Sequence, residues 1–136
     1  LTRFDEELGS CPAEVLLTPT RIYVKTVLSL IEKIKVKGIA HITGGGFIEN
    51  IPRIIPKNLG IKINTSSYEI PTIFRVLQKR AGIEDRKMYN TFNMGIGMVF
   101  CVSPDAEEEC LRVLKTLGED PVSLGVVTDK AGVEFE

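Results

Sequence analysis

The spacing of apolar residues predicts a first amphipathic helix from Thr20 to about Lys37. Apolar side chains recur there at intervals of three and four, which places them along one face of a helix: Val24, Val27, Leu28, Ile31 and Ile34. We expect this face to be buried. Thr20 is the expected N-cap, because a threonine hydroxyl can accept a hydrogen bond from the free amides of a first turn.

The same spacing predicts two longer helices further along the chain, each with clear ends. One follows Pro71 and stops at Gly82, and the other opens at Ser103-Pro104 and stops at Gly118. A short helix is expected near 48–55, where Pro52 and Pro56 limit its length. Alternating or continuous apolar runs predict strands over 39–42, 60–64, 92–102, 122–127 and 133–135.

Alternation of helices and strands along the chain predicts a layered α/β domain with helices packed against one sheet. Residues 15–136 form this domain, and residues 1–14 have a mixed pattern that we interpret as a linker or a lead-in from a preceding domain. Because the chain begins with Leu1, we expect it to be part of a longer protein.

Three consecutive glycines follow the first strand and are the most distinctive feature of the sequence. Gly44, Gly45 and Gly46 favour a turn with positive φ, and successive amides in such a turn form a concave site that suits an anion. Thr43, Asn50 and Arg53 are near enough in sequence to add polar contacts. The alternative is a tight turn with no ligand. The run lacks the residues of a Walker loop and the spacing of a dinucleotide fingerprint.

Four further side chains are candidates for chemistry. His41 is the only histidine and precedes the glycines by two residues, so it is either an acid/base or a satisfied core residue. Arg21, together with Lys25, is expected at a helix start, where its charge opposes the helix dipole and indicates an anionic partner. Asn93 precedes a strand whose one face is bare at Gly95 and Gly97; it either contacts a ligand or caps the turn.

Composition excludes several classes of function. The net charge of −1 over 136 residues provides no basic surface for nucleic acid. The three cysteines have no CxxC spacing, which favours a reducing compartment over a disulfide framework or a zinc site. No apolar run approaches the length of a membrane span, so we expect neither a membrane nor a nucleic acid as partner. No set of acidic residues has the spacing of a metal site.

Three runs together resemble one known family. They are Leu17-Thr18-Pro19-Thr20-Arg21-Ile22-Tyr23-Val24-Lys25, the run from His41 to Arg53, and Thr91-Phe92-Asn93-Met94-Gly95-Ile96-Gly97-Met98. Their order and spacing are similar to those of the C-terminal domain of phosphoribosylformylglycinamidine cyclo-ligase, also called aminoimidazole ribonucleotide synthetase. The resemblance extends from about Val15 to the end of the chain. It implies a mixed sheet with flanking helices, partly similar to the ferredoxin-like arrangement.

The resemblance also implies a reaction. The family uses ATP to activate the amide oxygen of formylglycinamidine ribonucleotide, and ring closure gives aminoimidazole ribonucleotide, a step of purine biosynthesis in the cytoplasm. An N-terminal domain that this chain lacks carries most ligands of ATP and Mg²⁺ and forms a homodimer. We therefore expect this chain to be inactive alone.

Two other classes of function stay open. One is another ATP-dependent enzyme of the same superfamily, such as formylglycinamidine ribonucleotide synthetase or selenophosphate synthetase. The other is a stand-alone phosphate-binding or regulatory module.

Overall fold

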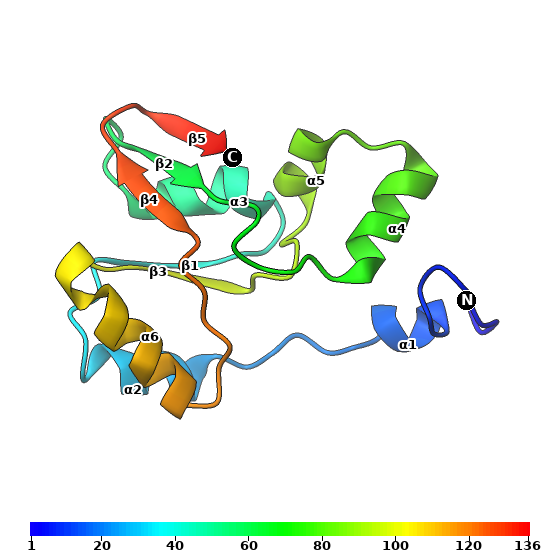
Figure 1. Cartoon of the computed structure of the whole chain (residues 1–136), viewed down its shortest axis with the longest axis horizontal. Coiled ribbons are helices and arrows are strands. Elements are labelled where there is room, and N and C mark those ends of the chain that lie inside the picture. The colour runs from blue at the N-terminus through cyan, green and yellow to red at the C-terminus, as the bar shows by residue number, and fades with distance from the viewer.

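Two small sheets organise the molecule, where the sequence predicts one (Figure 1). The computed structural model describes all residues from 1 to 136. In the first sheet β1 (Gly38–His41) runs antiparallel to β3 (Met98–Cys101), with His41 opposite Met98. The second sheet has the order β4-β2-β5. Its central strand β2 (Gly60–Ile63) is antiparallel to β4 (Gly125–Thr128) and parallel to β5 (Gly132–Phe135). The expected mixed sheet is therefore present as a three-stranded unit.

Six helices surround these sheets (Figure 1). They are α1 (Pro12–Leu16), α2 (Val24–Ile31), α3 (Gly46–Asn50), α4 (Thr72–Ala81), α5 (Asp85–Thr91) and α6 (Glu107–Thr116), with the 3-10 turns η1 (Ile51–Ile54) and η2 (Pro104–Ala106). Gly82, with φ 61°, ends α4, and Gly118, with φ 81°, follows α6, so both predicted stops are confirmed. None of the helices has the length and apolar character needed to cross a membrane.

The apolar interior is divided into two cores. The larger core joins β1 and β2 to α3 and α5, and it contains the fully buried side chains of Phe47, Ile63 and Met88. The smaller core lies between α2 and α6 and contains Leu30, Ile34, Cys110, Val113 and Leu114. Partly buried Val99 packs on the first core and its neighbour Phe100 on the second. The β1–β3 sheet therefore separates the two cores.

The predicted first helix is wrong in its start, in its end, which is at Ile31, and in most of its buried face, of which only Ile34 is confirmed as buried. It begins at Val24 with Tyr23 as N-cap, and the preceding residues 18–22 are not helical. Thr26, Leu30 and Ile34 are the buried positions. Val24, Leu28 and Ile31, here called the apolar stripe of α2, are 61%, 54% and 46% exposed.

A long-range contact explains which face of α2 is buried. The Thr26 hydroxyl donates to Oε1 of Glu119, beyond the end of α6, at 2.7 Å. Leu30 then packs against the apolar side of α6. The sequence offers apolar residues on both sides of α2, and the distant partner selects the side that is buried.

The predicted strand over 92–102 is much shorter than expected. Met94 has φ 50° and Gly95 has φ 99°, so the chain turns there and only β3 is extended. The bare side of Gly95 is covered by the ring of Pro71, whose Cδ would lie 2.6 Å from a Cβ at position 95.

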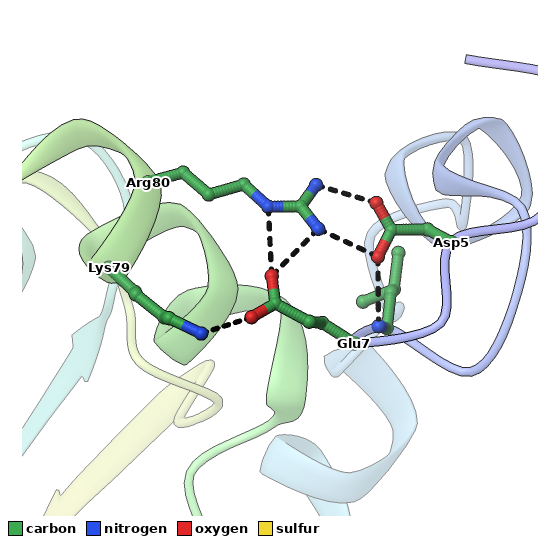
Figure 2. Close-up of polar contacts among 5 residues, drawn as sticks. Asp5, Glu7, Lys79 and Arg80 are labelled. Carbon is green, nitrogen blue, oxygen red and sulfur yellow. Dashed lines mark hydrogen bonds and ion pairs between the residues drawn. The ribbon is translucent and has the colours of Figure 1, made fainter.

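Residues 1–17 form a turn and the short helix α1. A β-bridge joins Asp5 to Ser10, and α1 has no buried residue. Charge holds this segment to α4, as Figure 2 shows. Arg80 donates to Asp5 at 2.5 and 2.8 Å and to Glu7 at 2.8 and 3.1 Å, and Lys79 also pairs with Glu7.

Candidate functional site

A cleft of about 490 Å³ brings the three sequence runs together. The first run contributes one wall through the connector between α1 and α2, and the second contributes the end of β1. Asn93 and Gly97 of the third run, with Phe74 of α4, complete the lining. Only three of the eleven lining residues are hydrophobic, so the cleft suits a polar ligand.

His41 lies on the wall of this cleft and is exposed, so the interpretation of a buried core histidine is wrong. Its ring stands edge-on to that of Tyr23, with centroids 5.9 Å apart and an interplanar angle of 66°. An exposed imidazole in a polar cleft can donate a hydrogen bond to a ligand or accept one from it.

Arg21 also lines the cleft, but the argument that led to it is wrong. Because α2 begins at Val24, Arg21 lies before the helix and its charge does not face the first turn. Its Nη2 is 3.0 Å from the Glu119 carboxylate and donates to the Gly118 carbonyl oxygen at 3.4 Å. These contacts join the connector to the end of α6. Since more than half of the side chain is exposed, Arg21 can contact a ligand as well.

The glycine turn is held from within by Asn50. This side chain is buried, and its Nδ2 donates to the carbonyl oxygens of Thr43, Gly44 and Gly46 at 3.4, 3.2 and 2.8 Å. Asn50 therefore stabilises the turn rather than contacting a ligand. Thr43 remains exposed on the cleft wall.

The three glycines have different structural roles. Gly46, with φ 53°, is pressed against α5, where a Cβ would lie 2.1 Å from the Tyr89 carbonyl oxygen. Gly45, with φ 94°, is the N-cap of α3. Gly44 faces open space, with nothing within 4 Å of a built Cβ. Two of the three glycines are thus explained by local packing and backbone conformation, and only Gly44 is free on the outside.

Arg53 and Asn93 are both engaged within the chain. Arg53 lies near Glu49, at 3.9 Å, and donates to Asn50 Oδ1 at 3.5 Å, and it does not line the cleft. The polar contact that Arg53 adds to the glycine turn is therefore the one to Asn50, not one to the cleft. Asn93 accepts the Gly95 amide at 3.1 Å, as a turn-capping residue does, while it also lines the cleft.

Residue-by-residue inspection of the sequence missed several parts of this site. Tyr23 lies in the same run as Arg21, and Gly97 was noted only as part of a bare strand face. Phe74 packs against the larger core and also lines the cleft. Glu119, the partner of Arg21, lies in no motif, and no signal in the sequence could have found it.

No three histidine, cysteine, aspartate or glutamate side chains gather where they could hold a metal ion. Burial raises the pKa of the Cys110 thiol, which keeps this side chain protonated in the smaller core. Cysteine chemistry is therefore not supported at this position.

Comparison with models of protein families shows the family to which the chain belongs. The model described as "AIR synthase related protein, C-terminal domain" matches residues 2–136. The chain belongs to the AIR synthase related family. As a member of this family it has helices and strands around a mixed sheet, as the resemblance implied.

Curated relatives of this AIR synthase related domain share about half of its residues. A protein of Clostridium perfringens named phosphoribosylformylglycinamidine cyclo-ligase is 54% identical over 125 residues, which is 90% of this chain and 37% of that protein. Proteins with the same name from a Thermoanaerobacter species and from Caldicellulosiruptor saccharolyticus are 50% and 49% identical, over 95% and 97% of this chain. The chain spans 37–39% of the length of these three relatives.

A solved structure supports the fold assignment. The crystal structure of Escherichia coli HypE, a hydrogenase maturation protein, superposes with a TM-score of 0.66 over 85% of this chain and 36% of that one. Sequence identity is 24%, so the likeness concerns the fold alone.

Proposed function

We propose that this chain is the C-terminal domain of a phosphoribosylformylglycinamidine cyclo-ligase. The whole enzyme converts formylglycinamidine ribonucleotide to aminoimidazole ribonucleotide with ATP, as a ligase of purine biosynthesis in the cytoplasm. The observation that carries this proposal is the convergence of three distant runs, each similar to that family, on one polar cleft. The names of relatives that are about 50% identical support the same enzyme.

The cleft contributes binding and orientation for a phosphate-bearing ligand. Arg21 supplies a cation, and Thr43 and Asn93 supply uncharged polar groups on the same wall. A cation with neutral donors is a combination that suits a phosphate, because charge-assisted hydrogen bonds are the stronger ones. His41 lines the same cleft, where it can hydrogen-bond the ligand or transfer a proton to or from it.

ATP and Mg²⁺ fit these residues to different degrees. A nucleotide phosphate suits the same cleft wall as a substrate phosphate. Mg²⁺ prefers carboxylate and other oxygen ligands, and no three acidic side chains of this domain are arranged so that they could hold a metal ion, so its residues do not form a magnesium site by themselves. The further chain of the longer relatives would have to supply the metal ligands and the homodimer contact. For this reason we expect the domain alone to be inactive.

A chimeric enzyme tests the proposal directly. This chain replaces the matching C-terminal part of the Thermoanaerobacter relative, to which it is 50% identical. Formation of aminoimidazole ribonucleotide from formylglycinamidine ribonucleotide, ATP and Mg²⁺ is then measured. The unaltered relative and the relative truncated before this part serve as positive and negative controls.

The proposal requires turnover by the chimera and none by this chain alone. A folded chimera that binds phosphate but does not turn over favours a phosphate-binding module. A chimera that consumes ATP only with a different acceptor favours another enzyme of the superfamily. Normal turnover by the isolated chain contradicts the expectation that the further chain of the longer relatives supplies the metal ligands.

A further inference from the structure

Tyr23, His41 and Gly97 come from three distant parts of the sequence and lie together in the cleft. The ring of Tyr23 meets the ring of His41 edge-on at a centroid distance of 5.9 Å. The phenol oxygen of Tyr23 lies over Gly97, so a Cβ built on this glycine would be only 1.9 Å from it. Tyr23 can therefore occupy its place only while residue 97 has no side chain.

The backbones of His41 and Gly97 are joined to each other, and the backbone of Tyr23 is held at the start of α2. Tyr23 is the N-cap of α2, and its carbonyl oxygen accepts the Val27 amide at 2.9 Å. The amide of Ile42, next to His41, donates to the Gly97 carbonyl oxygen at 2.9 Å. The imidazole of His41, in contrast, is exposed and has no hydrogen bond within the chain. The ring of Tyr23 is thus the contact that restricts how the imidazole can turn.

Packing of a core does not explain the position of Tyr23. It belongs to neither of the two hydrophobic cores, and it is only half-buried. Both its ring and its hydroxyl face the cleft wall. Edge-to-face contact is a favoured geometry of aromatic rings, which gives the pair a defined orientation.

We propose that Tyr23 is a positioning residue of the cleft, which holds the His41 imidazole toward the ligand, and that Gly97 lacks a side chain so that Tyr23 can lie there. The proposal rests on the proposed function for the identity of the ligand, a phosphate-bearing substrate or nucleotide. The placement of the imidazole itself can be tested without any activity.

The single histidine makes the first test unambiguous. The chain has one imidazole, so its ring protons give one set of NMR signals. We expect nuclear Overhauser contacts between these signals and the ring protons of Tyr23. They persist in the matched control Tyr23→Phe and are lost in Gly97→Ala, which pushes the phenol away. Gly97 needs no positive φ, so alanine causes no backbone strain there.

The second test measures how the contact between Tyr23 and His41 affects the kinetics of the chimeric enzyme described above. Tyr23→Leu and Gly97→Ala lower kcat by about tenfold to a hundredfold, while KM changes by about twofold or less, because a misplaced group costs rate rather than binding. Tyr23→Phe stays within about threefold of the parent. The double variant is no worse than Tyr23→Leu alone, since both changes remove the same contact.

Several results would overturn the positioning role. They are absence of the Tyr23–His41 contact in the parent chain, an unchanged kcat in folded Tyr23→Leu, or fully additive losses in the double variant. A chimera without turnover that retains the contact refutes the proposed function and leaves the placement of the imidazole standing. Thermal melting of each variant separates loss of fold from loss of position.

Discussion

Asn50 closes the glycine turn by donating its side-chain amide to the Gly46 carbonyl oxygen at 2.8 Å. The same nitrogen lies within hydrogen-bond distance of the Thr43 and Gly44 carbonyl oxygens. One buried amide thereby contacts three carbonyl oxygens of the turn. The turn is preformed by the chain itself, before any ligand binds.

Asn50→Ala should therefore lower stability rather than ligand affinity. Removing a buried partner leaves carbonyl oxygens unsatisfied, which costs about 1–3 kcal/mol in the free energy of unfolding. Urea unfolding of this chain measures the loss. Asn50→Asp is the matched control of similar shape without the donor, and it should lose as much or more. Unchanged stability in both variants would contradict the role assigned to Asn50.

Substitution of single glycines should separate packing from ligand contact. Gly46→Ala meets the Tyr89 carbonyl oxygen and strains a positive φ, so we expect a loss of about 2 kcal/mol or more. Gly44→Ala meets open space and should stay within about 0.5 kcal/mol. The same urea experiment applies. If Gly44→Ala also weakens phosphate binding without loss of stability, Gly44 is the glycine that faces the ligand.

Arg21 and Arg53 should differ in their effect on anion binding, although each loss removes one positive charge. Arg21→Ala should lower the affinity for inorganic phosphate or pyrophosphate by about tenfold, because a charge-assisted hydrogen bond is lost. Arg53→Ala should change affinity by about twofold at most, since it lies outside the cleft. The NMR signal of His41 reports binding in both. Equal losses would show that the anion sits over the glycine turn.

Glu119→Gln tests the same site in the opposite direction. It removes the negative charge beside Arg21 and keeps an acceptor for the Thr26 hydroxyl. Affinity for phosphate should rise in this variant. A fall would indicate that Glu119 positions Arg21 for the ligand.

His41→Asn should lower kcat/KM of the chimeric enzyme by about a hundredfold if the imidazole is a general acid or base. Because His41 is exposed, the variant should melt at nearly the temperature of the parent. Unchanged kinetics would show that His41 is not a general acid or base of the reaction. Thr43→Val, on the same wall, is the control for simple loss of a polar group.

The attachment of residues 1–17 to α4 should depend on pH. Hydrogen bonds from Arg80 lower the pKa of Asp5, and those from Lys79 and then Arg80 lower the pKa of Glu7. A folded-state pKa below the unfolded value gives a favourable contribution that is complete above the unfolded pKa. This contribution is lost as pH falls through the lower folded-state pKa. The attachment should therefore weaken below about pH 4.

Amide NMR signals of residues 1–17 measure this release between pH 7 and 3. Arg80→Gln should release the segment already at pH 7. Arg112→Gln is the control, because it removes an exposed arginine paired with Glu109 elsewhere. A segment that stays attached in Arg80→Gln would show that the ion pairs of Figure 2 do not hold it.

Local signals in the sequence predicted where α4 and α6 end and where η2 begins. Gly82 and Gly118 stop helices because glycine adopts positive φ at little cost, and Ser103 precedes η2 as a cap residue. Such signals involve only neighbouring residues. They therefore do not depend on the tertiary structure.

The buried face of α2 and the composition of the cleft could not be predicted in the same way. Thr26 is buried because Glu119, 93 positions away, accepts its hydroxyl. The role of Tyr23 could not be predicted from the sequence, because it depends on a contact with Gly97, a residue with no side chain. Resemblance to a family supplied the three runs, and only the fold shows that they meet.

The apolar stripe of α2 affects how the isolated domain behaves at high concentration. Val24, Leu28 and Ile31 stand in one row on the outside of the helix, and Ile22, just before it, is 83% exposed. A net charge of −1 provides almost no mutual repulsion between molecules. Near neutral pH the exposed apolar stripe of α2 can therefore associate with other molecules, and charge repulsion does little to prevent aggregation. A glutamate or lysine at position 28 would make it easier to keep in solution without altering either core.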